Sequence, residues 1–227
     1  MFDDFNSICN PYKPTPKWKS ITKTTLYLLL IVIISFSFIY LASHYAKPVH
    51  GVSMQPTLNT DSDDSRDIVL INKFAEPTNG NIVIINVSSI PFEYSGISSE
   101  TTLIIKRVIA VAGDRLKLTY DDETETTKVY LNGTLLQEDY INTFTSKSLY
   151  LNFVNQTHWQ TALEKNEYGE VTIPDGMIFC MGDNRDNSRD CRYFGPVSLN
   201  TLEGVVDCIL PDGTFWNDAL TELFNFT

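Results

Sequence analysis

The chain has 227 residues, 43% of them hydrophobic, and its 17 Lys and Arg residues against 28 Asp and Glu residues give a formal net charge of −11. This length and apolar content are enough for one domain with a substantial core plus a membrane segment. The charge excludes a nuclease or another nucleic-acid-binding protein, because binding to phosphates requires clustered positive charge.

An uncharged run of nineteen residues, 24–42, lies near the N-terminus. At about 1.5 Å per residue, a helix of this length nearly spans a hydrocarbon core of roughly 30 Å. The run exceeds the roughly 7–15 apolar residues of a cleaved signal peptide, and no Ala-x-Ala cleavage site follows it. We therefore expect one retained transmembrane helix over 24–42, a tail over 1–23 and a larger domain over 43–227.

Charge predicts the orientation of this anchor. Residues 1–23 carry four lysines and two aspartates, a net charge of +2, whereas residues 43–227 carry 13 Lys and Arg against 26 Asp and Glu, a net charge of −13; the two add to −11. Lysines on the N-terminal side of an anchor favour a cytoplasmic N-terminus. The larger domain is therefore expected outside the cytoplasm, in a single-pass arrangement.

The larger domain is expected to be mostly β. Its short apolar or alternating runs are separated by Gly, Asn and Asp, a pattern typical of antiparallel strands joined by tight turns. The predicted strands are 68–72, 81–87, 102–111, 116–120, 128–132, 177–181 and 204–210. Asn132-Gly133 is the clearest hairpin turn, and the acidic stretch 121–125 is expected at the tip of another hairpin.

Two segments show no clear strand pattern. Residues 139–170 have mixed polarity and no clean period, which indicates a variable surface insertion. Residues 212–227 could form a short amphipathic helix that packs either on the domain or at the membrane surface, and the sequence does not decide between the two.

Ser53 and Lys106 are the candidate catalytic residues. A serine hydroxyl is a weak nucleophile until a neighbouring base takes its proton, and a lysine can be that base only if desolvation lowers its pKa. Lys106 lies in the apolar run 103–109, which is predicted to be a strand. On a strand, Ile104, Lys106 and Val108 share one face, so the lysine lies between two branched aliphatic side chains. The pair therefore predicts a Ser–Lys hydrolase dyad, which uses no histidine.

Three blocks of sequence carry a family resemblance. They are Ser-Met-Gln-Pro-Thr-Leu at 53–58, Lys-Arg-Val-Ile followed by Gly-Asp at 106–114, and the segment from Gly-Asp-Asn-Arg-Asp-Asn-Ser to Phe-Gly-Pro-Val at 182–197. In this order and at this spacing, the chain resembles type I signal peptidase (leader peptidase) over roughly residues 24–211. The third block agrees over about sixteen residues, so the match does not rest on one short string.

The resemblance implies a membrane-anchored serine endopeptidase that removes N-terminal signal peptides from exported preproteins. The implied fold is an antiparallel β-rich catalytic domain with a hydrophobic face near the membrane lipid. Substrates would add as extended chains along a sheet edge, with small residues at positions −1 and −3 in shallow apolar pockets. No metal, no organic cofactor and no nucleic acid partner are expected.

The resemblance also implies roles for particular residues. Ser53 would be the nucleophile, with backbone N–H groups near it in the oxyanion hole, and Lys106 the general base. Gly51 stands where some family members carry a hydroxyl, and Met54 either shields the lysine from water or packs in the core. The hydroxyl of Ser188 would orient the lysine amine. The remaining supporting residues come from the second and third blocks, and the charged ones are expected to form structural ion pairs: Arg107, Gly182, Asp183, Asp190 and Arg192.

Three alternatives compete with this interpretation. A mitochondrial inner-membrane processing peptidase shares the motifs and the topology, but the third block favours a bacterial plasma-membrane enzyme. A catalytically inactive, membrane-tethered binding domain would need the loss of Ser53 or Lys106, and both are present. A Ser–His–Asp triad is disfavoured because the three histidines, His44, His50 and His158, are scattered along the chain.

The four cysteines show no CxxC motif and no Cys/His pair at metal-ligand spacing, so no metal site is expected. Cys9 lies on the predicted cytoplasmic side. Cys180, Cys191 and Cys208 belong to the outer domain, where one disulfide or isolated buried thiols would both fit, and this choice stays open.

Overall fold

The computed structural model describes residues 17–59, 66–90, 97–98, 100–142, 145–148, 150–151, 163 and 165–210. The chain divides into two compact units, Met1–Ala42 and Ser43–Thr227. Several parts named above lie outside the described residues: the first sixteen residues of the tail with Cys9, much of the expected insertion with His158, and the segment 212–227.

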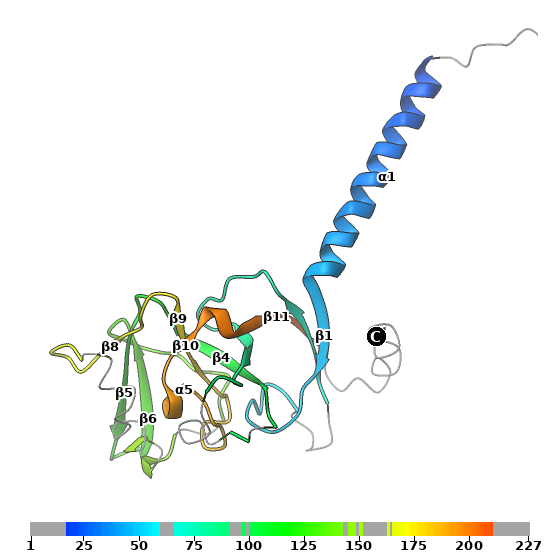
Figure 1. The fold of residues 1–227 in the computed structure, drawn as a ribbon. Coiled ribbons are helices and arrows are strands. Elements are labelled where there is room, and N and C mark those ends of the chain that lie inside the picture. Colours follow the sequence, from blue (N-terminus) through cyan, green and yellow to red (C-terminus); the bar gives the residue numbers. More distant parts are fainter. Residues whose placement is uncertain are drawn as a thin grey trace, which may run out of the picture. The chain divides into compact units, whose positions relative to one another are not determined.

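The described residues of the first unit all belong to helix α1, Lys17–Ser43, a continuous helix of 27 residues that ends at the first residue of the second unit (Figure 1). Within it, Ile21–Ser43 has a mean hydropathy of 2.4 and is long and apolar enough to cross a membrane. Its Leu, Ile, Val and Phe side chains are exposed on all sides, a surface that suits lipid and not water. The helix contains the expected anchor 24–42 and begins earlier, at Lys17.

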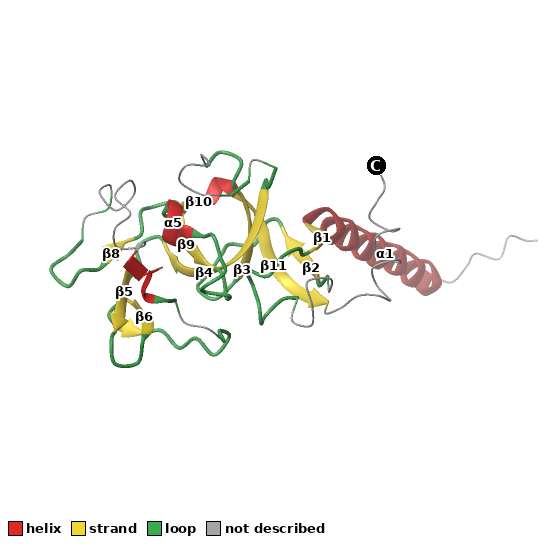
Figure 2. Ribbon diagram, turned by 90° about the horizontal axis from the view of Figure 1, so that it is seen from below, coloured by secondary structure: helices red, strands yellow, loops and turns green. Residues whose placement is uncertain are grey.

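The described part of the second unit contains eleven strands. Loops and turns join them (Figure 2). Their bounds are β1 His44–Pro48, β2 Ile68–Asn72, β3 Ile82–Asn86, β4 Leu103–Val111, β5 Arg115–Asp121, β6 Thr126–Leu131, β7 Thr134–Leu135, β8 Val171–Thr172, β9 Met177–Met181, β10 Val197–Ser198 and β11 Leu202–Leu210. Short helical turns accompany them, among them α5 at Cys191–Phe194 and a 3-10 turn at Leu199–Thr201.

The strands form two sheets. The larger sheet has the order β1-β2-β11-β3-β4-β9-β10, and the smaller one has the order β7-β6-β5-β8. Every pair of neighbouring strands in both sheets is antiparallel. The predicted fold class, a mostly antiparallel β-domain with one N-terminal apolar helix, is confirmed.

The predicted strands agree closely with the observed ones. Segments 68–72 and 177–181 match β2 and β9, and the other five agree with β3, β4, β5, β6 and β11 to within two residues at each end. Asn132 and Gly133 join β6 to β7 with φ angles of 54° and 82°, as a type I′ turn requires. The pattern does not predict β8 and β10, which are two residues long, or β1, which has no apolar alternation and forms by pairing with β2.

Apolar clusters cover both faces of the larger sheet. Strand β3 is buried at four of its five positions, because Ile82 and Ile84 face one cluster while Val83 and Ile85 face the other. The cluster around Val83 and Ile85 also includes side chains of β5 and β6, so it joins the two sheets. The paired strands β3 and β4 are therefore shielded from water on both sides.

Candidate active site

The loop that carries Ser53 has little conformational freedom. Its Met54 and Leu58 side chains are 1% and 0% exposed and belong to the cluster on one face of β3 and β4, so Met54 packs in the core. Asn59 closes the loop around Ser53, because its Nδ2 donates to Gly51 O at 3.0 Å and to Val49 O at 3.3 Å. Asn59 is itself held by two reciprocal hydrogen bonds with Asp67, from Asn59 N to Asp67 Oδ2 at 2.7 Å and from Asp67 N to Asn59 Oδ1 at 3.0 Å. These contacts hold the Ser53 hydroxyl in a defined place.

Lys106 lies on β4 and is only 3% exposed. Ile104 and Val108 pack in the cluster between the two sheets, so the predicted sharing of one strand face by these residues and the lysine is confirmed. The lysine Nζ lies 2.8 Å from Ser53 Oγ and 2.7 Å from the backbone oxygen of Ile105. The structure therefore brings together two residues that are 53 positions apart in the sequence.

Burial has the largest effect on the charge of Lys106. It lowers the pKa of the amine from 10.5 to about 8, because the ammonium ion loses its hydration in this apolar environment. The charge of Asp190 raises the same pKa, and the charge of Arg192 lowers it. A neutral amine has two N–H groups and one lone pair. Since Ile105 O can accept one N–H, the lone pair can accept the proton of Ser53.

The third block packs against the backbone of the nucleophile. Asn184 N donates to Ser53 O at 3.1 Å, and Asn184 Nδ2 donates to Val52 O at 3.0 Å. A Cβ built on Gly182 would lie 2.4 Å from Ser53 O and 2.2 Å from Ser188 Oγ. No side chain fits at position 182, so this glycine allows the block to approach Ser53.

Ser188 does not contact the lysine amine through a hydrogen bond. Its side chain is buried, and its Oγ makes no hydrogen bond of normal geometry to any residue that the structure describes. The Lys106 amine is hydrogen-bonded to Ser53 and Ile105 instead. The orienting role expected for Ser188 stays a prediction.

Two bidentate ion pairs flank the site. Arg107 donates from Nε to Asp183 Oδ1 at 2.9 Å and from Nη2 to Oδ2 at 2.6 Å. Arg192 donates from Nε to Asp190 Oδ1 at 2.9 Å and from Nη2 to Oδ2 at 2.8 Å. Burial raises the pKa of Asp190. The charge of Arg192 and the hydrogen bonds that this carboxylate accepts lower the pKa by more, so the pKa lies below its ordinary value. Asp190 is therefore a paired carboxylate and not a carrier of protons.

A third buried ion pair was not found by sequence reasoning. Arg185, 1% exposed, donates to both carboxylate oxygens of Glu138, at 3.0 and 2.5 Å, and from Nε to Gly182 O at 3.1 Å. Through this pair, Glu138 helps to fix the glycine that packs on Ser53. No periodicity marks Glu138, and nothing in the polar segment around Arg185 indicates from the sequence that the two side chains form a buried pair.

The start of the expected insertion 139–170 packs on the same block. The Tyr140 ring contacts two guanidinium groups, with its centroid 4.1 Å from Arg107 Cζ and 6.0 Å from Arg185 Cζ. Thr145 is 2% exposed, and its hydroxyl accepts a hydrogen bond from Arg192. This part of the segment is therefore not a solvent-exposed loop.

A cleft of about 310 Å³ opens beside Ser53 and Lys106. Residues 103–106 of β4 line one part of it, and residues 47–50 line another. Strand β4 pairs with β9 only from Arg107 onwards, so among the described strands its first four residues have a partner, β3, on one side only. This open strand edge can accept the backbone of an extended chain.

The described histidines do not act on Ser53. His44 contacts Ser43 Oγ through Nδ1 at 2.8 Å and Asp207 Oδ2 through Nε2 at 2.9 Å. Ser43 is 7% exposed, so a substrate carbonyl cannot reach its hydroxyl. His50 lines the cleft but forms no hydrogen bond with Ser53 in the described structure.

The three cysteines of the second unit are free thiols. Cys180 and Cys191 are buried in the core, and Cys208 is exposed on β11. Among the residues that the structure describes, no group of three or more His, Cys, Asp or Glu side chains is arranged to hold a metal ion.

The model of a family described as signal peptidase, peptidase S26, matches residues 18–210, a span that contains both Ser53 and Lys106. The chain belongs to the signal peptidase family. It is a serine endopeptidase that acts on the signal peptides of preproteins, and the apolar helix α1 fits a membrane-anchored member of this family.

Signal peptidases of bacteria and a mitochondrial protease are similar to this chain. Probable signal peptidase I-2 of Synechocystis is 28% identical over 195 residues, which are 84% of this chain and 72% of that protein. Signal peptidase I of Bacillus caldolyticus is 28% identical over 80% of this chain and 86% of that protein. Mitochondrial inner membrane protease subunit 2 of Danio rerio is also 28% identical, over 76% of this chain and 67% of that protein. Identity alone therefore does not separate the two compartments.

We expect Glu138→Gln to lower both stability and activity. The change leaves the buried Arg185 guanidinium without a carboxylate, and losing one partner of a buried pair costs on the order of 3–5 kcal/mol. Because Arg185 also holds Gly182 O, the block against Ser53 should shift and cleavage should slow. Thermal unfolding and cleavage of a soluble signal-peptide substrate measure the two effects.

Asp122→Asn is the matched control. It breaks the pair of Asp122 with Lys147, in which both side chains are exposed, so the melting temperature and the cleavage rate should hardly change. Equal, small effects of the two substitutions would contradict the role assigned to Glu138.

Proposed function

We propose that Ser53 is the nucleophile and Lys106 the general base of this signal peptidase. The observation that carries the proposal is the 2.8 Å contact between Lys106 Nζ and Ser53 Oγ, in surroundings that lower the pKa of the amine to about 8. Near neutral pH a useful fraction of such a lysine is neutral, whereas an ordinary lysine is almost wholly protonated. The serine thereby gains a base without a histidine.

The reaction runs in two stages. The neutral Lys106 amine accepts the Oγ proton as Ser53 attacks the carbonyl carbon of the scissile peptide bond. The protonated amine gives this proton to the leaving nitrogen as the C–N bond breaks, and the signal peptide stays on Ser53 as an ester. A water molecule then attacks the ester, Lys106 takes its proton and returns it to Oγ, and the signal peptide leaves as a carboxylate.

A backbone donor is available for the oxyanion that forms in each stage. The N–H of Ser53 makes no hydrogen bond to a described residue, which supports its use as a donor to the substrate oxygen. Gly51 has no side-chain donor to add. It has a φ of 87°, and no atom lies within 4 Å of a Cβ built on it, so the substrate backbone can approach closely.

We propose that the signal peptide lies extended along the open edge of β4, at residues 103–106. Successive side chains of an extended chain point to opposite faces, so the residues at −1 and −3 point the same way. The cleft of about 310 Å³ beside Ser53 would receive both, and its small volume favours alanine at each position.

The proposed location is the plasma membrane, with the N-terminus in the cytoplasm and the catalytic unit outside. The charge step from +2 over 1–23 to −13 over 43–227 supports this orientation. The mitochondrial inner membrane is the second candidate, because the Danio rerio protease is as similar as the bacterial relatives. An inactive binding domain is disfavoured, because Ser53 and Lys106 are both present and in contact.

We expect Ser53→Ala and Lys106→Ala each to lower kcat by on the order of 10⁴-fold or more, with the domain still folded. Because the two residues act as one unit, the double variant should be hardly slower than either single variant. Cleavage of a purified preprotein gives the rates, and circular dichroism checks the fold. Appreciable turnover by Lys106→Ala, or additive losses, would rule out the dyad.

The pH dependence of kcat/KM should report the loss of the proton from Lys106. Lys106 acts as a base only after losing its proton, so the rate should rise with pH and reach half its maximum near pH 8. Val108→Thr places a hydroxyl on the apolar strand face that Lys106 shares. It should move the rising limb of the pH profile to higher pH, because hydration favours the ammonium form of the lysine.

Val129→Thr makes the same change at an equally buried position on β6 and should leave the limb in place. If the limb also stays in place in Val108→Thr, that valine does not keep the amine dry.

Cleavage should prefer alanine at −1 and −3, and phenylalanine at −1 should block it by steric exclusion.

Only about ten residues separate the anchor 24–42 from Ser53, so the nucleophile stays near the bilayer, where signal peptides end. Deleting residues 1–42 should therefore slow cleavage of membrane-inserted preproteins far more than cleavage of short soluble peptides. Equal losses of kcat/KM on both substrates would contradict a role of the anchor in presentation.

A further inference from the structure

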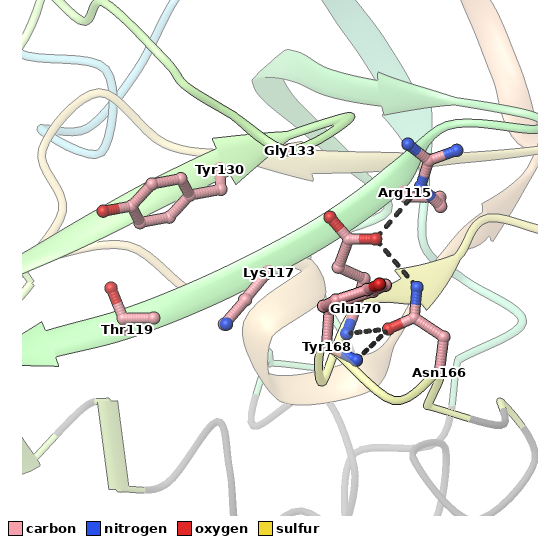
Figure 3. A pocket seen from close by; sticks show the side chains of 8 residues that line it. All are labelled: Arg115, Lys117, Thr119, Tyr130, Gly133, Asn166, Tyr168 and Glu170. Atoms are coloured by element: carbon pink, nitrogen blue, oxygen red, sulfur yellow. Dashed lines mark hydrogen bonds and ion pairs between the residues drawn. The ribbon is translucent and has the colours of Figure 1, made fainter.

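A second and larger cleft lies on the smaller sheet. Its volume is about 730 Å³, and it shares no lining residue with the cleft beside Ser53. Figure 3 shows it over β5 and β6, with the turn 166–170 as one wall. Small-molecule sites of proteins typically measure roughly 300–1,000 Å³, so this cleft is large enough for a ligand of several rings.

Hydrogen bonds fix the wall formed by the turn. Asn166 Oδ1 accepts from Tyr168 N at 3.0 Å and from Glu170 N at 2.9 Å. Glu170 Oε2 accepts from Asn166 Nδ2 at 2.8 Å and from Arg115 Nε at 3.0 Å, and these bonds are drawn in Figure 3. The wall is therefore built before any ligand arrives.

The cleft offers hydrogen-bond donors and a net positive charge. Lys117 and Thr119 point outward from β5 at alternate positions, while Leu118 between them faces the core. Neither side chain makes a hydrogen bond to a described residue, and the terminal nitrogens of Arg115 make none either. Arg115 and Lys117 against Glu170 give the lining a charge of +1, whereas residues 43–227 carry −13.

Two tyrosine rings provide the apolar surface. Tyr130 lies on β6 opposite Lys117, and Tyr168, 66% exposed, lies on the turn. No aliphatic side chain lines the cleft in the described structure, so it has no pocket for acyl chains or for apolar residues of a peptide. Strand β5 is paired with β6 along most of its length and with β8 at Arg115 and Leu116, so at this end of the cleft its backbone is paired on both sides. Flat rings beside polar donors suit a hydroxylated ring.

We propose that this cleft binds an anionic oligosaccharide whose sugar rings carry carboxylates. A carboxylate would be bound by the Lys117 ammonium and the terminal nitrogens of Arg115, since charge-assisted hydrogen bonds are the stronger ones. Sugar hydroxyls would be bound by Thr119 and the phenol groups, and the flat face of a ring would pack on Tyr130 or Tyr168. The site is separate from Ser53 and Lys106 and does not rest on the proposed mechanism.

Ligand-observed saturation-transfer NMR on the full chain in detergent micelles tests the proposal. The probes are tri-galacturonic acid, uncharged galactotriose and monomeric galacturonic acid. We expect tri-galacturonic acid to bind, its affinity to fall with added salt, and galactotriose to bind at least about tenfold more weakly. The monomer should bind more weakly than the trimer, because the cleft exceeds one ring.

Variants separate this site from general surface charge. Lys117→Met and Tyr168→Ala should each weaken tri-galacturonic acid binding by about tenfold, while cleavage of a short signal-peptide substrate is unchanged. Lys73→Met changes an exposed lysine outside the cleft, and this variant should bind tri-galacturonic acid with the affinity of the wild type. Absence of binding at millimolar concentration, equal binding of galactotriose or of the monomer, or unchanged binding by Lys117→Met would overturn the proposal.

Discussion

A lysine amine in water keeps its proton far above neutral pH, and only the removal of water makes it a base at the pH of a cell. In this protein the amine of Lys106 is 3% exposed and lies 2.8 Å from the hydroxyl that it must deprotonate. The apolar side chains of Ile104 and Val108 lie on the same face of the strand. The other parts of the site serve to maintain this dry contact while leaving one strand edge open to substrate.

The fold meets these two demands in different places along one strand. At Arg107, next to the lysine, β4 is paired with both β3 and β9, and apolar clusters pack on both faces of the strand. Before Arg107 the β9 side is open, and the cleft begins there. Charged groups near the amine are paired with partners of opposite charge, as Asp190 is with Arg192, which limits their effect on the lysine. The third block reaches the Ser53 backbone because Gly182 has no side chain.

Features that depend on local pattern were predictable from the sequence. The strands of the catalytic unit have alternating side chains and turn residues at their ends, and the turn at Asn132 and Gly133 follows from the tolerance of these residues for positive φ. The face shared by Ile104, Lys106 and Val108 follows from the geometry of a strand alone. The pairing of Lys106 with Ser53 was predicted from the apolar surroundings of the lysine, and the family resemblance implies the same pair.

Contacts between distant segments were not predictable in the same way. Glu138 lies in a stretch without periodicity, and its burial depends on Arg185, which comes 47 positions later. The hydrogen bonds between Asn59 and Asp67 likewise carry no pattern that separates them from surface residues. The cleft over β5 and β6 requires the turn 166–170 to fold back over the sheet, and a sequence of mixed polarity does not predict such a contact.

Direct titration of the Lys106 amine tests the central claim most closely. With ¹⁵N-labelled lysine in the full chain, NMR follows each side-chain nitrogen as a function of pH, and Lys106→Arg assigns the signal by removing it. The account predicts that this amine titrates at about 8, well below the ordinary lysine value of about 10.5. A Lys106 amine that titrates at the ordinary lysine value would show that burial does not make it a base, and would contradict the account.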